Sequence, residues 1–433
     1  MSLIKTSLLN GIAVAVKVST AILLNKILAL YVGPTGYAII GQLQNTLAIA
    51  VSLSGGVISS GITKETAEHF YDEARQHAVW QTAVRLTLAA TIIASISLMI
   101  AGPWLSNLIL QRLDMSSVFV FAGLSLPAIA INNLLLSIIN GKKELGIYIT
   151  ANIIGSLLSL AIGALFTYKL GLYGALLAIV VSPAILLFAT GALVSRSSWF
   201  KAKFLWGKSQ RSVLRELSGF ALMGLAATLA APITYMFIRD YLAMSLGLNA
   251  AGYWQASWKI SEIYLMLVTT TLSVYYLPRL AEIRVAHELE CEIFKVYKLV
   301  LPVAVIGAFA IYLLRDFIVQ YMFSHEFEPM RDLFIWQLIG DVIKIGSWIL
   351  SYIMLGRAMV KSFVITEIAF SLSFCFLSIL MINSYGLSGV AIAYAINYCV
   401  YWGVMACLVK REMRKMVSST SVIEVVLPQL NQS

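Results

Sequence analysis

The sequence predicts an all-α polytopic membrane protein of about twelve transmembrane helices in two lobes, and three observations carry this prediction. The chain has 433 residues, of which 60% are hydrophobic and only 12% are charged. That charged fraction is about half of what a soluble domain shows. Many apolar runs are long enough to cross a bilayer, which takes roughly 20 residues. Finally, glycine motifs of the first half recur in the second half.

Hydropathy divides the chain into successive spans whose connections are mostly too short to fold separately. The first span begins close to the N-terminus, and the last ends before a basic tail. The predicted spans are roughly residues 6–31, 37–62, 79–101, 116–140, 146–168, 172–194, 218–245, 250–278, 293–314, 331–355, 361–383 and 387–409.

The formal net charge of +10 indicates cytoplasmic loops rather than a nucleic-acid partner, because Lys and Arg concentrate on the cytoplasmic side of membrane proteins. The basic residues cluster around 64–75, 142–143, 196–215, 279–295, 357–361 and 410–415. The opposite loops hold only Arg112, Lys169, Arg315 and Arg331. We therefore expect both termini and the 196–217 loop to be cytoplasmic. A lipid-headgroup site in that loop is the alternative interpretation of its charge.

The internal repeat defines the expected domain organisation. Gly171-Leu172-Tyr173-Gly174 returns as Gly386-Leu387-Ser388-Gly389, and Gly141-Lys142 returns as Gly356-Arg357 at the same offset. Each half has an even number of predicted spans, so the halves are parallel repeats related by a pseudo-two-fold axis along the membrane normal. The expected parts are an N-terminal lobe at 1–195, a basic linker at 196–217, a C-terminal lobe at 218–410 and a cytoplasmic tail at 411–433.

Three basic residues within spans are candidate anion ligands. A charge in hydrocarbon costs several kcal/mol unless it is paired or faces water. Lys17 and Lys26 have no acidic residue three or four positions away, and the Asp240 that follows Arg239 points elsewhere on a helix. We expect Lys17, Lys26 and Arg239 to bind a phosphate or another anion.

Two further sets of charges are spaced to pair. Lys259 with Glu262, and Asp341 with Lys344, are three positions apart and share a helix face. Each set is either a neutralising pair or, through its carboxylate, part of a proton-coupling device. Glu262, Asp341 and Lys344 are therefore candidate ion-coupling residues. Packing and an interfacial belt are the expected roles of the nearby aromatic residues, among them Trp254 and Trp258, with sugar stacking as the alternative.

Motifs of soluble catalysis are missing from the sequence. We find no phosphate-binding loop, nucleophile elbow or metal-ligand spacing. The sequence therefore favours a protein that is not an enzyme and that needs no cofactor or metal.

The run from Met330 to Lys344, MRDLFIWQLIGDVIK, closely resembles the Wzx-type lipid-linked oligosaccharide flippases. Gly33-Pro34-x-Gly36, Trp254-Gln255 and the turn Leu313–Phe317 extend the resemblance over nearly the whole chain. It is greatest for the branch that translocates repeat units of enterobacterial common antigen and O-antigen.

This resemblance implies the fold of the multidrug/oligosaccharidyl-lipid/polysaccharide exporter superfamily, the MATE-like fold, with helices 1, 2, 7 and 8 beside a central cavity. It implies an undecaprenyl-diphosphate-linked oligosaccharide as substrate, moved to the periplasmic leaflet of the bacterial inner membrane by alternating access. Lys17, Lys26, Arg239 and Lys259 fall on those helices, so the resemblance implies that Lys259 is a candidate substrate ligand beside the other three. The implied partners are this lipid, the bilayer, and polysaccharide polymerase and chain-length machinery; no nucleic acid is implied.

Other transport and enzyme classes are weighed against this expectation. A multidrug or other small-molecule antiporter of the same fold is the main alternative, but a cavity for cationic drugs should be acidic. A membrane glycosyltransferase or polymerase should carry a sizeable extracytoplasmic loop, and Arg315–Arg331 is short. A sugar/proton symporter of another twelve-helix fold is the remaining alternative.

Overall fold

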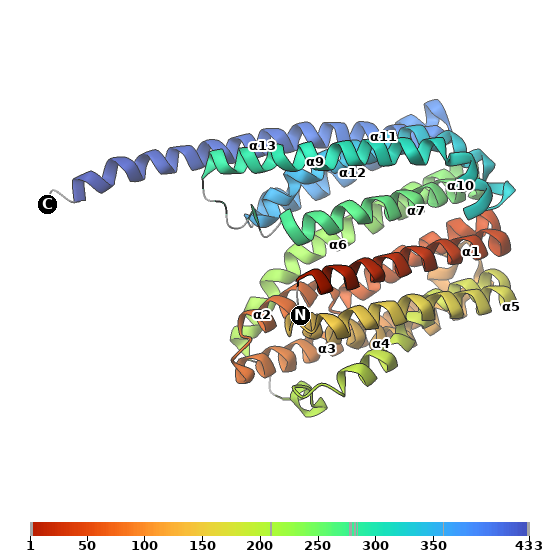
Figure 1. Ribbon diagram of the computed structural model, residues 1–433. Helices are drawn as coiled ribbons and strands as arrows, with labels where there is room; N and C mark the ends of the chain where they lie inside the picture. The colour runs from red at the N-terminus through yellow and green to blue at the C-terminus, as the bar shows by residue number, and fades with distance from the viewer. Residues whose placement is uncertain are drawn as a thin grey trace. The chain divides into compact units, whose positions relative to one another are not determined.

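The computed structural model describes residues 3–207, 210–276, 279–280, 283, 285–357 and 359–430. These residues form helices and short turns, and no strand occurs among them (Figure 1). The chain divides into two compact units. Unit 1 comprises Met1–Arg239 with Tyr321–Phe327, and unit 2 comprises Asp240–Gln320 with Glu328–Ser433.

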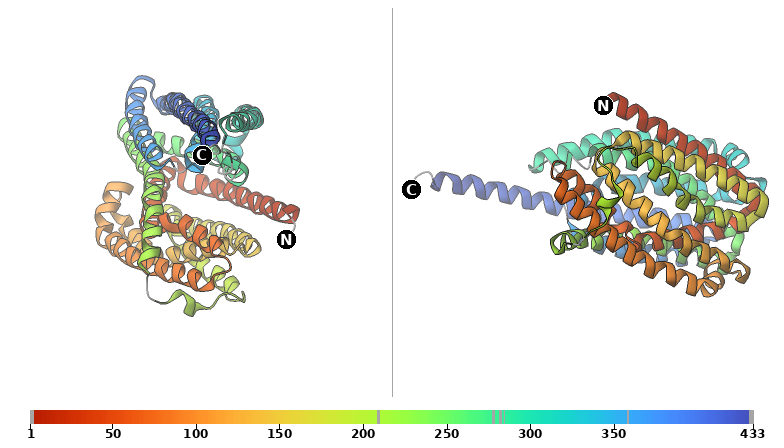
Figure 2. Two further views of the ribbon diagram at one scale, coloured as in Figure 1. Left: turned by 90° about the vertical axis from the view of Figure 1, so that its left-hand side faces the viewer. Right: turned by 90° about the horizontal axis from the view of Figure 1, so that it is seen from below.

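Unit 1 is built on α1 and α5, which run side by side, and on α4, which packs against α3 and α5 (Figures 1 and 2). Its helices are α1 (Leu3–Leu53), α2 (Ser59–Glu68), α3 (Glu73–Leu105), α4 (Ser116–Gly141), α5 (Leu145–Val194) and most of α6 (Arg211–Leu246). Its short turns are η1 (Gly56–Ile58), η2 (Ser106–Leu110), η3 (Leu113–Met115) and η4 (Ala202–Leu205).

The two longest helices of unit 1 are each bent at one glycine. Gly33 in α1 has φ 63°, and Gly171 in α5 has φ 56°. Glycine reaches this left-handed region without steric cost, whereas other residues are strained there. Each label therefore covers two helical arms, and these arms correspond to the predicted span pairs 6–31 with 37–62 and 146–168 with 172–194.

The predicted span at 37–62 was wrong at its far end. Helix α1 stops at Leu53, and α2 begins separately at Ser59. Gly55 lies between them with φ 102°, and a Cβ there would come within 2.6 Å of the Thr87 hydroxyl. The apolar residues that continue through this stretch hid the break from hydropathy.

Unit 2 is organised around α11, which packs against α7, α9, α12 and α13. Its helices are α7 (Leu248–Thr271), α9 (Ala286–Leu313), α11 (Phe334–Gly356), α12 (Val360–Tyr385) and α13 (Leu387–Leu430), with a π turn, η5 (Leu272–Tyr276). Helix α13 extends well beyond its neighbours in this unit (Figure 1, blue). The connection from α9 to α11 contains α10 (Arg315–Met322) and η6 (His325–Leu333), and with them the segment that belongs to unit 1.

Eight helices within the described residues are long and apolar enough to cross a membrane. Two of them, α1 and α5, supply two arms each because they bend. Helices α6 and α7 have 36 and 24 residues and are also of spanning length. The protein is therefore an all-α polytopic membrane protein, as the sequence predicted.

The internal repeat is visible in the backbone of both units. Gly171 has φ 56° and ψ −134°, and Gly386, its predicted counterpart, has φ 59° and ψ −137°. A Cβ on Gly174 would lie 1.9 Å from the Phe166 carbonyl oxygen. One on Gly389 would lie 2.1 Å from the carbonyl oxygen of Met381, which stands at the same offset. Glu144 and Met359, which precede α5 and α12, also share their conformation, with φ −80° and −79° and ψ 60° in both.

The segment predicted as a basic linker is packed onto unit 1 by its aromatic residues. Trp199, Phe204 and Leu205 cover a buried cluster that includes Trp80 at the start of α3. The Phe204 ring stacks on His77, with 4.0 Å between centroids. This segment is therefore anchored by apolar contacts as well as bearing charge.

Candidate functional site

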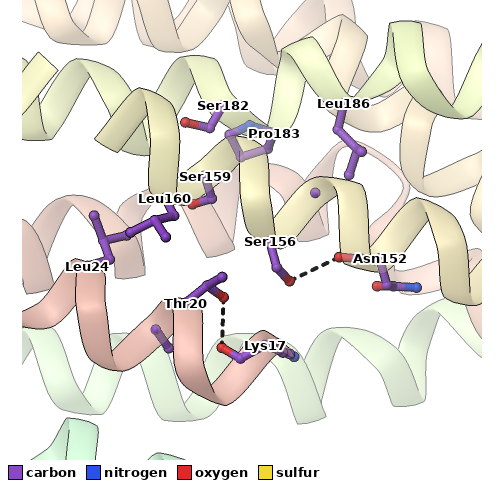
Figure 3. A pocket seen from close by; sticks show the side chains of 12 residues that line it. Lys17, Thr20, Leu24, Asn152, Ser156, Ser159, Leu160, Ser182, Pro183 and Leu186 are labelled. Atoms are coloured by element: carbon purple, nitrogen blue, oxygen red, sulfur yellow. Dashed lines mark hydrogen bonds between the residues drawn. The ribbon is translucent and has the colours of Figure 1, made fainter. Parts of the chain in front are cut away.

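Lys17 lies at a small pocket inside unit 1. The pocket is formed by the first arm of α1 and both arms of α5 and has a volume of about 320 Å³. Figure 3 shows Lys17, Thr20 and Leu24 on one side, with Ser156 and Ser159 among the residues opposite. Within the described part of the chain, the Lys17 ammonium has no hydrogen bond or ion pair.

The hydroxyl groups of this pocket are oriented by their own helices. Thr20 donates to the Val16 carbonyl at 2.8 Å, Ser156 donates to the Asn152 carbonyl at 3.0 Å, and Ser182 donates to a carbonyl one turn earlier at 2.6 Å. Their oxygens are left able to accept hydrogen bonds. The Lys17 ammonium suits an anionic group such as a phosphate, and the acceptor oxygens suit the hydroxyl groups of a ligand.

Lys26 has a different environment, close to the bend of α1. Its ammonium donates to the backbone carbonyl of Phe323, in the Tyr321–Phe327 segment of unit 1. The same segment is held by Tyr37, whose ring meets Phe323 at 5.9 Å and Phe327 at 5.6 Å between centroids. The Tyr37 hydroxyl donates to Asn25 at 2.7 Å. Lys26 therefore joins α1 to a remote part of the chain.

Arg239 is almost completely buried, with 3% of its surface exposed. Its Nη1 donates to the Gln42 side-chain oxygen at 2.7 Å. Gln42 in turn donates to the Met236 carbonyl at 3.3 Å, so it spans from α1 to α6. In this conformation the guanidinium donates to the Gln42 side-chain amide.

Lys259 and Glu262 form the pair that their spacing predicted. The ammonium lies 2.7 Å from the carboxylate, and the two side chains are 23% and 57% exposed. The predicted contact is confirmed, and both side chains are partly exposed at the surface of unit 2.

Asp341 and Lys344 do not form the predicted pair among the described residues, although both are buried. Asp341 accepts a hydrogen bond from Ser261 at 2.6 Å and one from Tyr394 at 2.9 Å. The Lys344 ammonium lies instead over the ring of Trp258, 4.8 Å from its centroid. The two side chains leave the same helix toward different partners, which sequence spacing does not reveal.

The predicted site residues thus occupy separate places in the two units. Lys17 faces a pocket, Lys26 a backbone carbonyl and Arg239 an amide, while the other four lie in unit 2. Sequence reasoning missed Gln42 and Ser261 as partners of buried charges. The sequence did offer a signal for both, because each is a polar residue within an otherwise apolar span. Trp254, which is 1% exposed, confirms the expected packing role.

Comparison with protein families matches residues 5–284 to the family described as polysaccharide biosynthesis protein. In curated proteins, the chain is 29% identical over 406 residues to the lipid III flippase of Escherichia coli strain K12. The match covers 93% of this chain and 97% of that protein. The lipid III flippase of Shigella flexneri matches with the same identity and coverage.

Solved structures share the fold. An inward-facing MATE family transporter of the MOP superfamily has a TM-score of 0.77 at 16% identity, over 94% of this chain and 99% of that one. A MOP superfamily transporter from Pyrococcus furiosus has a TM-score of 0.70 at 18% identity, over 95% and 96% of the two chains. These likenesses show a MATE-like fold. The family match covers more than half of the sequence, and the chain therefore belongs to the polysaccharide biosynthesis protein family.

Proposed function

We propose that this protein is a flippase that moves a lipid-linked oligosaccharide across a membrane. The observation that carries the proposal is the likeness to the lipid III flippases, which extends over 93% of the chain and so over both units. The MATE-like fold supports a transporter rather than an enzyme. The cations in the helices of unit 1 supply groups suited to an anionic headgroup.

The proposed substrate is an undecaprenyl-diphosphate-linked repeat unit of O-antigen or enterobacterial common antigen. It moves from the cytoplasmic to the periplasmic leaflet of the bacterial inner membrane, and both termini of the protein are cytoplasmic. Lys17, Lys26 and Arg239 bind the diphosphate through charge-assisted hydrogen bonds at successive stages of transport. Pocket hydroxyls such as Ser156 bind sugar hydroxyls, and the polyprenyl chain stays in lipid. Alternating access moves the headgroup, and polymerase and chain-length machinery receive the product.

The alternative is a multidrug or other small-molecule antiporter. The likeness to multidrug transporters bears on the fold alone, because their identity to this chain is only 16–18%. The three candidate ligands in unit 1 are basic, and basic groups repel cationic drugs. The charge of these residues thus favours an anionic substrate.

The proposal is tested in a strain that lacks the gene, with lipid-linked intermediates measured by mass spectrometry. Accumulation of an undecaprenyl-diphosphate oligosaccharide, reversed by the wild-type gene, is the expected result. Unchanged intermediates together with altered drug resistance would contradict the flippase and favour the antiporter.

Charge variants test the site in the same strain. We expect Lys17→Ala, Lys26→Ala and Arg239→Ala each to reduce export, and Arg239→Lys to retain part of it, because an ammonium keeps the charge but loses the planar fork. Lys298→Ala, at an exposed position on α9, is the matched control. Protein abundance is measured alongside, since Arg239 and Lys26 also hold structural contacts. Normal export by all three alanine variants would rule out the proposed anion ligands.

A further inference from the structure

Helix α11 buries a lysine at the centre of unit 2. Lys344 is 4% exposed, and Asp341, one turn earlier, is fully buried. Lysine is almost never fully buried unless it is paired, because removing its charge from water costs several kcal/mol. Among the described residues, however, Lys344 forms no ion pair. Something other than a salt bridge must compensate its charge.

The compensation comes from an aromatic box. The ammonium lies 4.8 Å from the ring centroid of Trp258, 4.9 Å from Trp348, 5.3 Å from Tyr394 and 4.8 Å from Tyr398. These residues come from α7, α11 and α13, so three helices converge on one ammonium group. Rings in this arrangement direct their negative faces at a cation, which is how proteins bind ammonium ligands.

The walls of the box are themselves fixed. Tyr394 packs edge-on against Trp258, with 5.5 Å between centroids, and against Tyr398, with 4.9 Å. The Tyr394 hydroxyl donates to Asp341 at 2.9 Å, and Ser261 donates to the other carboxylate oxygen at 2.6 Å. The Asp341 carboxyl group thus lies behind the Tyr394 wall and is oriented by two hydroxyls.

We propose that this box is a site for a primary ammonium or another monovalent cation, and that the chain fills it with its own cation, the Lys344 side chain. An exchangeable ion is then not needed to balance Asp341. The side chain acts as a tethered ion, so removing it opens a cation site in unit 2. This inference concerns the box alone and does not depend on what the protein transports.

The part of the side chain that Lys344→Ala removes determines which small molecule can test the site. Lys344→Ala removes three methylene groups and the ammonium, and n-propylammonium supplies a chain of the same length and charge. The full-length variant is purified, and its thermal unfolding is followed while n-propylammonium chloride is added. We expect Lys344→Ala to unfold at a lower temperature than the wild type. Saturating n-propylammonium should then raise its Tm by roughly 2 °C or more, because a ligand that binds only the folded state stabilises it.

Matched controls separate charge from volume. Propanol fills the same space without a charge, sodium chloride supplies ionic strength, and Lys298→Ala lacks an exposed lysine on α9. The site predicts no comparable rise with propanol, none in Lys298→Ala, and a weaker rise in the double variant Asp341→Asn/Lys344→Ala. A rise with sodium chloride that is absent from Lys298→Ala and weaker in Asp341→Asn/Lys344→Ala also supports a cation site, whereas an equal rise in all variants is an effect of ionic strength and contradicts it. Equal stabilisation by propanol, or none by any cation, would overturn the proposal.

A second pair of variants covers the case in which Lys344→Ala does not fold. Lys344→Met keeps the volume, and Tyr398→Leu removes one wall of the box. If the Tyr398 ring stabilises the Lys344 ammonium, the double variant Lys344→Met/Tyr398→Leu should lower the Tm by less than the sum of the two single decreases. Strict additivity would show that Lys344 and the box do not interact, and the tethered-ion account would be wrong.

Discussion

At the scale of single residues, glycines set the turns that allow long helices to fold back. Gly171 and Gly386 have positive φ, and a Cβ on either would meet no atom within 4 Å. Gly174 and Gly389 instead lie against carbonyl oxygens of the helical segment that precedes the bend. Gly171 and Gly386 are therefore needed for the backbone conformation, and Gly174 and Gly389 for the close contact between two backbone segments.

This distinction predicts an order of destabilisation. Gly171→Ala and Gly386→Ala should each cost about 1–2 kcal/mol, because a left-handed conformation is strained for alanine. Gly174→Ala and Gly389→Ala should cost more, because the new methyl group would overlap backbone at 1.9 Å and 2.1 Å. Thermal unfolding of the purified variants measures the order. Gly403→Ala, which meets no atom within 4 Å and needs no positive φ, is the control; a loss there as large as at Gly174 would refute the argument.

The two acidic positions of unit 2 predict another contrast. Glu262 is 57% exposed in its pair with Lys259, whereas Asp341 is fully buried and accepts two hydroxyl hydrogen bonds. Glu262→Gln should cost less stability than Asp341→Asn, because Glu262 is partly exposed at the surface of unit 2. Asp341→Asn should cost more, because an amide cannot replace both charge-assisted acceptors. Unfolding of both variants checks this, and equal losses would mean that burial does not govern these carboxylates.

Export measurements extend the contrast to function. In a double-mutant cycle of Lys259→Met and Glu262→Gln, a structural pair predicts that the double variant exports better than the worse single variant. A requirement for the carboxylate in transport predicts instead that every variant carrying Glu262→Gln fails. The sequence alone left these two roles open, and the observed 2.7 Å contact favours the structural pair.

At the scale of elements, the segment around η4 is anchored by packing. Trp199 packs against the buried cluster that includes Trp80, and its indole donates to Glu144 at 3.3 Å. The Lys142 ammonium lies 5.6 Å from the Trp199 ring centroid. These contacts tie the segment to the start of α5.

Loss of this anchor should expose the segment. We expect Trp199→Ala to increase trypsin cleavage after Lys201 and Lys203, because fraying precedes proteolysis. Trp206→Ala, at a position that is 66% exposed, should leave cleavage unchanged. Equal cleavage of wild type and Trp199→Ala in limited proteolysis would mean that the aromatic contact does not hold the segment.

The sequence predicted the helices better than the contacts that their side chains make. Spans followed from apolar length, and the repeat followed from the glycine motifs around Gly171 and Gly386, where both glycines have the positive φ that glycine reaches without steric cost. The break at Gly55 was missed, since hydropathy carries no backbone information. The Lys344 box could not be predicted, because its rings come from three helices and converge only through tertiary packing.

At the scale of the whole molecule, the charge distribution predicts a topology. Basic residues concentrate in alternate loops, so Ser198 and Ser433 should both lie in the cytoplasm. Reporter fusions that score compartment at these two positions check this. A periplasmic signal at either position would contradict the predicted topology.

The most direct measurement of the central proposal is translocation by the purified full-length protein in liposomes. The liposomes carry an undecaprenyl-diphosphate oligosaccharide in both leaflets, and an impermeant glycosidase is added outside. The account predicts that wild-type protein exposes the inner-leaflet lipid to the enzyme, and that Lys17→Ala/Lys26→Ala/Arg239→Ala slows this while Lys298→Ala does not. Digestion limited to the outer-leaflet lipid, as in protein-free liposomes, would contradict the flippase.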